Sequence, residues 1–452
     1  MLKITVENVV WSRVEKRDAP KLYDCLSYMY KRHIYNPHAR QRSIYKDETE
    51  YFITSDGLFL TGFIPRVKKY LDNKNIEYDV IDRSEKLLPT NLPELKTINL
   101  RDDQLRLVNN LTSNQRGVIV AGTGSGKTAI AAAIISCYKK KRTLFMCHTR
   151  SLVTQAMGDF KQYGLKNITM VSDGKEDYSG DIVVATWQSV IKSLDKISDV
   201  FDLTFVDEVH KISDKDVKYS EILQQMLSPI RVGLTATFPS VQKSQFAIEG
   251  VIGEVVGELT PEEAKEKKIV VDTKVVIRKT VLDQDVRELS RYPEVYRSGI
   301  VNNRNFNTQV IREAKSWVDK GESVLVFFVE IDQGKLLKEI ADELGFDCEL
   351  IYGATDSNGR EIVKRDLKAK KLKCVLASKI WNEGISIPQL SVVINAAGGK
   401  SDIMVRQLHG RGTRLCEGKD ILTFVDFFNP SHNFFISHFG QRFSNYCDWG
   451  WV

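Results

Sequence analysis

Short apolar runs, each followed by a helical pattern, recur along most of the chain. Between residues 117 and 237 these runs are GVIVAG, TLFMCH, DIVVATW, LTFVDE and RVGLTAT. Continuous apolar runs of this length are typical of strands that are buried on both faces of a parallel sheet. The same pattern returns in the second half as SVLVFFV, CELIYG, KCVLAS, SVVINAA and ILTFVDFF. The pattern therefore predicts two α/β domains in tandem.

Breaks in this pattern predict the domain boundaries. The charged, irregular stretch ELTPEEAKEKK at 258–268 separates the two series of runs. The first 95 residues lack the alternation and close with the proline-punctuated segment LLPTNLPELK. We therefore predict a small N-terminal accessory domain that binds DNA at 1–95, a first α/β domain at 96–257 and a second at 258–452. A chain of 452 residues is also too long for a single core.

Composition adds only broad limits. The formal net charge is +6, so an anionic partner must be met by local basic patches and not by a uniform basic coat. The seven cysteines contain no C-x-x-C pair, which favours buried thiols in a reducing compartment over a disulfide or zinc framework. The N-terminus lacks the pattern of a signal peptide, and no apolar run approaches the roughly 18 residues of a membrane span. We expect a soluble, monomeric, cytoplasmic protein without a membrane partner.

The first candidate site is the glycine-rich stretch AGTGSGKT at 121–128, between a predicted strand and a predicted helix. Its glycines let successive backbone amides face one centre, and the helix N-terminus adds partial positive charge, so the loop suits the polyphosphate of ATP. Lys127 would reach the β- and γ-phosphates, and Thr128 would ligate Mg²⁺. The predicted phosphate-binding residues are Gly122, Thr123, Gly124, Ser125, Gly126, Lys127 and Thr128.

Two adjacent acids close the apolar run LTFVDE. A buried carboxylate costs several kcal/mol unless it is paired, so Asp207 and Glu208 are expected at a strand end where a cation can reach them. Together with the glycine-rich loop, they predict nucleotide hydrolysis: Asp207 holds Mg²⁺ through its water shell, and Glu208 polarises the attacking water. His210 either links this site to the nearby GLTAT stretch or simply begins a helix.

The segment RQLHGRGTR at 406–414 indicates which class of nucleotide hydrolase this is. At its spacing, Arg411 and Arg414 share one helical face. An arginine finger must approach the γ-phosphate from outside the domain that carries the phosphate loop, although an exposed basic helix would have the same pattern. With this segment, residues 97–430 resemble the superfamily-two helicases and translocases. The resemblance implies an α/β fold with two tandem RecA-like parallel-sheet domains that close on ATP, beside the small N-terminal accessory domain.

Further segments resemble the motifs of that family in the same order. LRDDQ at 100–104 resembles the segment that reads adenine, which implies that Gln104 contacts the base. HTRSLVTQ and ATWQS resemble motifs Ia and Ib, and GLTATF resembles motif III, which links the ATP state to the nucleic-acid path. The resemblance implies that strand phosphates are held by Thr149, Arg150, Thr186 and Gln188.

In the second domain, LASKIWNEGISIPQL at 376–390 resembles motif V. This implies that Ser378 touches a phosphate and that Gly384 allows close backbone approach near the nucleotide. Ser386 stands where most family members have aspartate, so the hydrogen bond of that aspartate does not carry over. The GISI form resembles the phage branch-migration helicases of the UvsW type, as do 301–314 and 55–71, which also resemble XPB-like helicases.

Two aromatic stretches leave alternatives open. YKRHIYNPHARQRSIYK at 30–46 is basic and tyrosine-rich, so it either pairs with phosphates and stacks on bases or is a solvated basic loop. Trp449 and Trp451 either stack on a displaced base or dock onto the body of the protein.

These observations predict a function. We expect an ATP-driven, Mg²⁺-dependent DNA helicase that acts on branched or forked DNA in replication, recombination or repair. An RNA helicase and a restriction-type duplex translocase remain open alternatives. A P-loop metabolic kinase needs neither RQLHGRGTR nor a second series of strands, and Lys127, Glu208 and Arg414 argue against a clamp that does not hydrolyse ATP.

Overall fold

The computed structural model describes most of the 452 residues. The residues outside the description are 35–43, 123, 173, 214–217, 261–262, 264–265, 268–270, 281, 283–285, 354, 379–389, 401–404, 406–408, 410–411 and 413–418. The side chains of 32–34, 44–45, 213, 357–358, 361 and 364 are also outside it. The chain forms two compact units: 1–121 with 126–259, and 260–452 with the loop tip 122–125.

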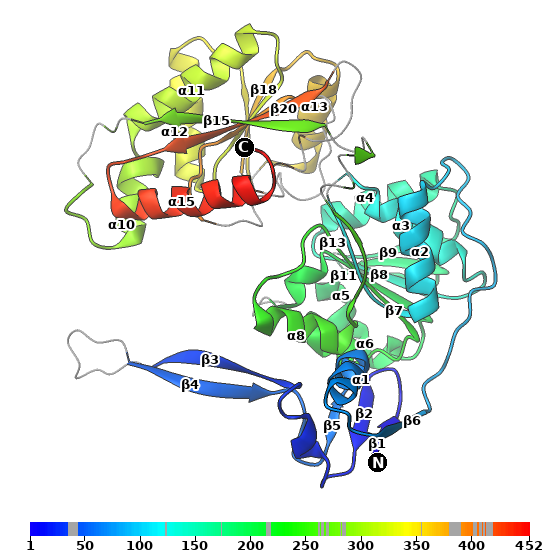
Figure 1. The fold of residues 1–452 in the computed structure, drawn as a ribbon. Helices are drawn as coiled ribbons and strands as arrows, with labels where there is room; N and C mark the ends of the chain where they lie inside the picture. Colours follow the sequence, from blue (N-terminus) through cyan, green and yellow to red (C-terminus); the bar gives the residue numbers. More distant parts are fainter. Residues whose placement is uncertain are drawn as a thin grey trace. The chain divides into compact units, whose positions relative to one another are not determined.

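The first unit contains a sheet whose described strands have the order β10-β9-β11-β8-β12-β13-β7-β14, and all neighbours are parallel except β10 and β9 (Figure 1). Each predicted run between 117 and 237 forms one of the central strands. The strands are β7 (Arg116–Ala121), β8 (Thr143–Cys147), β9 (Ile168–Ser172), β10 (Lys175–Glu176), β11 (Ile182–Thr186), β12 (Leu203–Asp207), β13 (Ile230–Thr235) and β14 (Val255–Leu259).

Helices cover both faces of this sheet, which explains why its strands are apolar throughout. On one face, Val118 and Val206 pack in the core cluster that α5 to α8 complete, and on the other face Phe145 meets Phe160 of α4 edge to face. The helices are α2 (Asp102–Asn114), α3 (Lys127–Ser136), α4 (Arg150–Gln162), α5 (Trp187–Val190), α6 (Leu194–Ile197), α7 (Tyr219–Gln225) and α8 (Gln242–Val251).

The second unit holds a sheet with the order β15-β20-β19-β16-β18-β17 in its described part, and every pairing is parallel. Its strands are β15 (Asp272–Lys279), β16 (Val324–Phe327), β17 (Glu349–Ile351), β18 (Cys374–Ala377), β19 (Val392–Asn395) and β20 (Ile421–Phe428). Its helices are α10 (Tyr292–Tyr296), α11 (Arg304–Asp319), α12 (Ile331–Glu343), α13 (Ser357–Lys368) and α15 (Asn433–Asp448). The predicted fold class, two parallel-sheet RecA-like domains, is confirmed.

The N-terminal residues form a small sheet of order β5-β2-β1-β6, with α1 (Ile64–Asn73) packed against it. Its strands are β1 (Leu2–Val6), β2 (Trp11–Val14), β5 (Leu58–Leu60) and β6 (Tyr78–Asp82). Between β2 and β5, the antiparallel pair β3 (Ser27–Ile34) and β4 (Ile44–Tyr51) extends away from this sheet as a ribbon (Figure 1). The stretch 30–46 therefore belongs to this hairpin, and residues 35–43 lie outside the description.

The N-terminal sheet shares its core with helix α8. Phe246 of α8 is buried among the N-terminal aromatic rings, stacked 4.8 Å from Phe52 and 5.7 Å from Phe63. Beside it, Arg66 forms a two-pronged ion pair with Glu249, with N–O distances of 2.9 and 2.6 Å. The accessory sheet is therefore joined to α8 by apolar packing and by a directional, partly buried ion pair.

The described part of the chain also contains four short 3₁₀ helices, η1 to η4, and one short π-helix, η5. These are η1 (Ala19–Leu22), η2 (Thr61–Phe63), η3 (Ile191–Ser193), η4 (Val209–Ser213) and η5 (Arg297–Val301). None of the helices in the described residues is long and apolar enough to cross a membrane.

Candidate nucleotide site and nucleic-acid contacts

The glycine-rich loop connects the end of β7 to the start of α3. Gly124 and Gly126 have φ values of +90° and +88°, a backbone conformation that glycine adopts without strain. The Ser125 hydroxyl donates to the Gly122 carbonyl at 2.7 Å, which tightens the turn. Thr123 lies outside the described residues. The strand–loop–helix geometry is that of a phosphate-binding loop at a helix N-terminus.

Lys127 and Thr128 lie in the first turn of α3. The Lys127 ammonium donates to the Ala121 carbonyl at 3.1 Å, so its side chain folds back toward the end of β7. Thr128 is partly buried next to it. A hydroxyl here and the Asp207 carboxylate at the end of β12 are the kinds of oxygen ligand that Mg²⁺ takes beside phosphate and water.

Gln104 packs directly against the phosphate loop. Its side-chain oxygen accepts from the Arg101 backbone amide at 3.1 Å and caps α2. A Cβ on Gly126 would lie 2.5 Å from the Gln104 amide nitrogen, so the loop has no room for a side chain there. The structure thus places Gln104 beside the loop, and its contact with the adenine base stays a prediction.

Asp207 and Glu208 lie at the end of β12, as expected for two acids that close a buried strand. Burial, together with the Glu208 carboxylate, raises the pKa of Asp207 to about 7, and the Lys127 ammonium acts in the opposite direction. The Asp207 carboxylate also accepts from the Glu208 backbone amide at 3.1 Å. Three of the predicted catalytic groups are therefore close enough to influence one another electrostatically.

Glu208 itself has a strained backbone, with φ of +53°. Non-glycine residues in this left-handed region are uncommon and cluster at functional sites, because the surrounding structure must hold them there. The conformation turns the chain from β12 into η4. A strained acid at the end of a strand, next to the phosphate loop, supports the prediction that Glu208 acts in catalysis.

His210 connects the acids to the segment that resembles motif III. Its Nδ1 lies 3.0 Å from the Thr235 hydroxyl and 3.3 Å from the Glu208 carboxylate. The Thr235 hydroxyl in turn donates to the Thr237 carbonyl at 2.8 Å. Of the two interpretations of His210, the link to GLTAT is therefore present in the structure, although His210 also lies in the turn η4.

The predicted strand-binding residues of the first domain lie on neighbouring strand ends. Thr149 caps α4 after β8, and the exposed Arg150 begins that helix. Thr186 ends β11 opposite Cys147 of β8, and the exposed Gln188 follows it in α5. Because β7, β8, β11, β12 and β13 are parallel, their carboxyl ends meet at one edge of the sheet, which is where parallel α/β sheets bind their ligands.

The second unit carries the remaining predicted residues. Ser378 directly follows β18 and is buried, with its backbone amide donating to the Ile351 carbonyl at 3.0 Å. Gly384, Arg411 and Arg414 lie outside the described residues, so their roles stay predictions.

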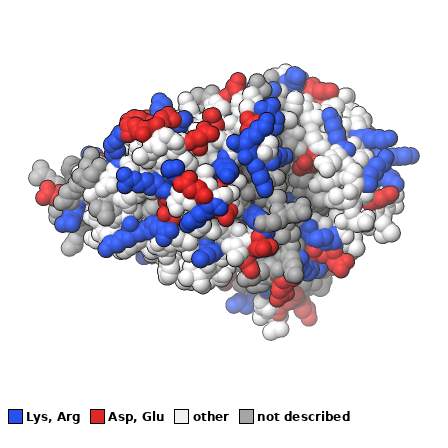
Figure 2. Space-filling view, turned by 90° about the horizontal axis from the view of Figure 1, so that it is seen from above, with Lys and Arg blue, Asp and Glu red and all other residues white. Residues whose placement is uncertain are grey.

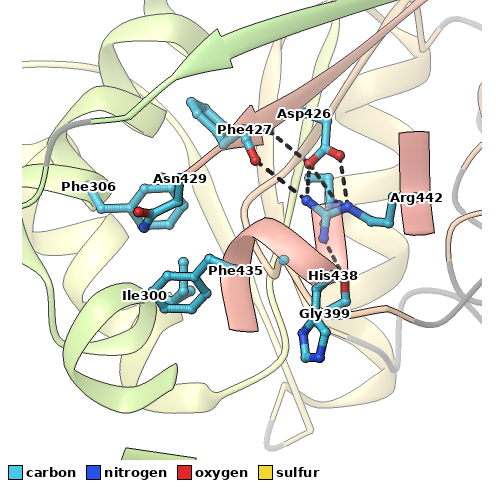
Figure 3. Close-up of a pocket in the computed structure, with 11 residues that line it drawn as sticks. Ile300, Phe306, Gly399, Asp426, Phe427, Asn429, Phe435, His438 and Arg442 are labelled. Carbon is cyan, nitrogen blue, oxygen red and sulfur yellow. Dashed lines mark hydrogen bonds and ion pairs between the residues drawn. The ribbon is translucent and has the colours of Figure 1, made fainter. Parts of the chain in front are cut away.

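One buried cluster of the second unit was not predicted. Figure 3 shows it at a small cavity, where Arg442 of α15 reaches the carboxylate of Asp426 at 2.8 and 3.1 Å. Asn395 donates to the same carboxylate at 3.2 Å. Asp426 interrupts the apolar run ILTFVDFF. An acid within a run that is expected to be buried could have indicated that it needs a buried cationic partner. Its partner lies 16 residues away on another element, which no local pattern reveals.

The two tryptophans near the C-terminus pack onto the second unit, so the docking alternative is confirmed. The ring centroids of Trp449 and Trp451 lie 4.7 Å apart, and both rings pack against the core cluster that contains Phe424 and Tyr446. On the surface drawn in Figure 2, basic and acidic side chains are interspersed, which agrees with a net charge of only +6.

Two family models match the chain. Residues 97–240 match the res subunit of type III restriction enzymes, and residues 307–416 match the helicase conserved C-terminal domain. Each match falls on one of the two parallel-sheet domains. The chain belongs to the superfamily-two helicases and is an ATP-dependent helicase.

Relatives from phages and archaea are similar over most of the chain. The probable helicase D10 of Escherichia phage T5 is 26% identical over 77% of this chain and 75% of its own. The DNA 3'-5' translocase XPB2 of Sulfurisphaera tokodaii is 27% identical over 75% and 84%. The ATP-dependent DNA helicase uvsW of Enterobacteria phage T4 is 24% identical over 74% and 72%.

Solved structures support the fold. The type ISP restriction-modification enzyme LlaBIII bound to DNA has a TM-score of 0.58 at 16% identity, over 84% of this chain and 32% of that enzyme. A fragment of a putative HsdR subunit from Vibrio vulnificus has a TM-score of 0.56 at 18% identity, over 84% and 71%.

Proposed function

We propose that this helicase is a DNA motor that remodels branched DNA, forks and four-way junctions, in replication, recombination or repair. The observation that carries the motor assignment is the shared edge of the first sheet. There the phosphate loop, the acids of DEVH, the GLTAT segment and the candidate strand-binding ends of β8 and β11 lie together. Two of the relatives are named as a DNA translocase and a DNA helicase, which favours DNA as the substrate.

In the hydrolysis step, the first domain supplies the phosphate-binding groups and the base that activates the attacking water. Lys127 leaves the Ala121 carbonyl and pairs with the β- and γ-phosphates, while the amides of the loop bind the remaining phosphate oxygens. Glu208 orients and polarises the attacking water. Thr128 and Asp207 would hold Mg²⁺, which would supply positive charge to offset the negative charge of the phosphates.

The second domain supplies the positive charge for the transition state. Arg411 and Arg414 approach the γ-phosphate and stabilise the charge that develops as its bond breaks, a role worth about 10³-fold or more in rate. His210 reports the nucleotide state to the GLTAT segment through Thr235. Contacts of Thr149, Arg150, Thr186, Gln188 and Ser378 with the phosphates of one strand convert this cycle into movement along DNA.

The preference for branched DNA rests on the accessory domain of residues 1–95. This domain is attached to α8, which follows the GLTAT segment, and its hairpin projects from the attachment point. A motor that grips one arm of a junction while an attached domain meets another arm converts translocation into strand exchange at the branch point.

The test compares initial rates on four substrates at equal salt, because phosphate contacts make every affinity salt-dependent. Forked and four-way DNA should be processed at least about 10-fold faster than a tailed linear duplex or an RNA duplex. Equal rates on the tailed linear duplex would reject the branch preference and leave a general DNA helicase. Equal rates on the RNA duplex would favour the RNA helicase.

A further inference from the structure

We propose that helix α15 and the residues that follow it help to position the proposed arginine fingers, through contacts that Arg442 makes with Gly399 and Trp451 makes with His409. Of the segment 406–414, the structure describes His409 and Gly412. Neither Arg442 nor Trp451 reaches the nucleotide in this proposal, so both are positioning residues. The inference rests on the proposed role of Arg411 and Arg414 in ATP hydrolysis.

The first contact lies before the segment. Arg442 is 4% exposed and its Nη1 donates to the carbonyl of Gly399, at the turn that follows β19 (Figure 3). Its other nitrogens are fixed by Asp426, which also accepts from the Tyr446 hydroxyl at 2.7 Å. A guanidinium whose fork is already occupied by a buried carboxylate has little freedom to move. The Gly399 carbonyl is therefore held by a rigid donor.

The turn itself consists of two glycines whose backbone is not restricted by side chains of their own. Gly398 and Gly399 both have positive φ, at +60° and +79°. Two successive residues in the left-handed region reverse the chain sharply, and glycine is free to leave that conformation as easily as it enters it. A charged donor on the Gly399 carbonyl removes this freedom where the chain starts toward the arginines.

The second contact lies inside the segment. The His409 ring stacks on the Trp451 ring with centroids 3.7 Å apart and an angle of 21° between the planes. The His409 Nε2 is also 2.5 Å from the Thr273 hydroxyl on β15. His409 is thus held by a ring on one side and by a hydrogen bond from the sheet on the other. It precedes Arg411 by two residues and Arg414 by five.

Trp451 is itself fixed to α15. Its ring lies 5.7 Å from Tyr446 with an angle of only 13°, and 5.8 Å from Phe424 of β20. Tyr446 is the residue that shares Asp426 with Arg442. The two contacts are therefore joined through α15 and the residues that follow it, and together they hold the chain at Gly399, before the segment, and at His409, within it.

Backbone position matters here because an arginine finger stabilises charge only when its guanidinium meets the developing oxyanion. A misplacement of about 1 Å costs on the order of 10²-fold in rate. ATP binding depends instead on the phosphate loop. Loosening His409 should therefore reduce kcat and leave KM for ATP nearly unchanged.

The experiment measures ATPase kcat and KM at saturating single-stranded DNA for Trp451→Ala and Trp451→Phe. We expect Trp451→Ala to lower kcat about 10-fold with KM within 2-fold, and Trp451→Phe to recover most of kcat because a ring still stacks on His409. Trp317→Ala is the matched control: Trp317 packs on α11 against the core of the same unit and has no contact with 398–414 in the described residues. It should lower the melting temperature and leave kcat unchanged.

A second measurement distinguishes positioning from general destabilisation. In an Arg414→Ala background, single-turnover rates should show no further loss from Trp451→Ala, because the group it positions is gone. If both changes multiply, or if Trp451→Ala leaves kcat intact while Arg414→Ala lowers it, the positioning role is wrong and the proposed function stands. If neither Arg411→Ala nor Arg414→Ala lowers kcat, the proposed role of these arginines fails, and this inference fails with it.

Discussion

At the scale of single residues, the predicted nucleotide site combines two adjacent carboxylates, which repel each other, with the Lys127 ammonium group. Asp207 and Glu208 are adjacent carboxylates, and the pKa of Asp207 is raised to about 7 by burial and by that neighbour. Lys127, the nearest opposing charge, is bonded to a backbone carbonyl of its own loop. A bound Mg²⁺, as proposed above, would supply the positive charge that two adjacent carboxylates lack, and perturbed carboxylates of this kind are common in active sites.

Glu208→Gln tests the base. Glutamine keeps the size of the side chain and can still accept a hydrogen bond from water, but it cannot take a proton. We expect ATP to bind within a few-fold of wild type while kcat falls by about 10² to 10³-fold. The measurement is steady-state ATPase beside binding of a fluorescent ATP analogue. A near-normal kcat would remove Glu208 from the catalytic role.

Asp207→Asn tests the raised pKa through stability in chelated, nucleotide-free buffer. The folded-state pKa of about 7 lies above the unfolded value of about 4, so the folded protein binds the proton more tightly. The ionised carboxylate therefore destabilises the fold fully above pH 7, and this cost disappears as the pH falls toward 4. The neutral side chain of asparagine removes this destabilisation at every pH.

The variant should consequently melt about 5 °C higher than wild type at pH 8, and the difference should shrink steadily toward pH 4. A scan of melting temperature against pH for both proteins measures this. A difference that is constant with pH, or that grows in acid, would contradict a raised pKa.

At the scale of elements, the central strands were more predictable than the strands near the sheet edges. Nine of the ten apolar runs form interior strands, because strands covered on both faces need apolar side chains throughout, and the tenth, CELIYG, forms the edge strand β17. β9, β10, β14 and β15 were not predicted. All residues of β15 are exposed or only partly buried and its end is charged, as in DTKVVIRK, so it lacks the continuous apolar signal.

A small N-terminal domain was predicted, but its internal fold and its packing on α8 were not, for a different reason. Phe246 of α8 completes its core, and Glu249 on the same helix pairs with Arg66, which precedes it by 183 residues. Contacts of this kind are set by tertiary packing, which leaves no periodic signal in either segment. The residues of the nucleotide loop, by contrast, were predictable because the chemistry depends on consecutive residues.

Gly62→Ala tests whether the attachment of the accessory domain matters for branched DNA. A Cβ at Gly62 would lie 2.0 Å from the Glu249 carbonyl and 2.5 Å from that of Gly250, and both are backbone atoms that cannot move aside. The methyl group should therefore push the N-terminal sheet away from α8. Fork and junction rates should fall about 10-fold, while ATPase stimulated by single-stranded DNA stays within 2-fold.

Gly440→Ala on α15 is the control, because a Cβ there meets nothing within 4 Å. Alanine is also the better helix former, so this variant should be at least as stable as wild type. Arg66→Ala provides a second route to the same separation by removing the ion pair with Glu249. Unchanged branch preference in both Gly62→Ala and Arg66→Ala would show that the attachment is dispensable.

At the scale of the whole molecule, we propose different roles for the two parallel-sheet domains and the accessory domain. The first domain carries the phosphate loop and the acids, and the second carries the proposed arginine fingers and the helix that we propose positions them. The accessory domain shares a core with α8, so deleting residues 1–90 would expose Phe246 and leave Glu249 unpaired. Such a deletion confuses loss of a DNA contact with damage to the first domain.

Shortening the hairpin avoids this problem. Lys31 and Asp47 are register partners in β3 and β4, so replacing residues 32–46 with Asn-Gly closes the ribbon with a two-residue turn that suits antiparallel strands. Tyr28 and Phe52, which contact Phe246, stay in place. The change removes most of the basic, tyrosine-rich stretch without touching the attachment to α8.

If this stretch holds a second arm of a junction, the shortened protein should lose most of its preference for forks and four-way junctions, falling about 5-fold or more toward the tailed duplex. Its ATPase with single-stranded DNA should be unchanged, because the predicted strand-binding residues lie at the edge of the first sheet. The dependence of junction affinity on salt should also weaken, since each lost phosphate contact removes about one counterion from the slope. Initial rates and junction binding at several salt concentrations measure both effects. A shortened protein that keeps its preference and its salt slope would mean that the 30–46 stretch is only a solvated basic loop, and that any discrimination between branched and linear DNA arises in the two motor domains.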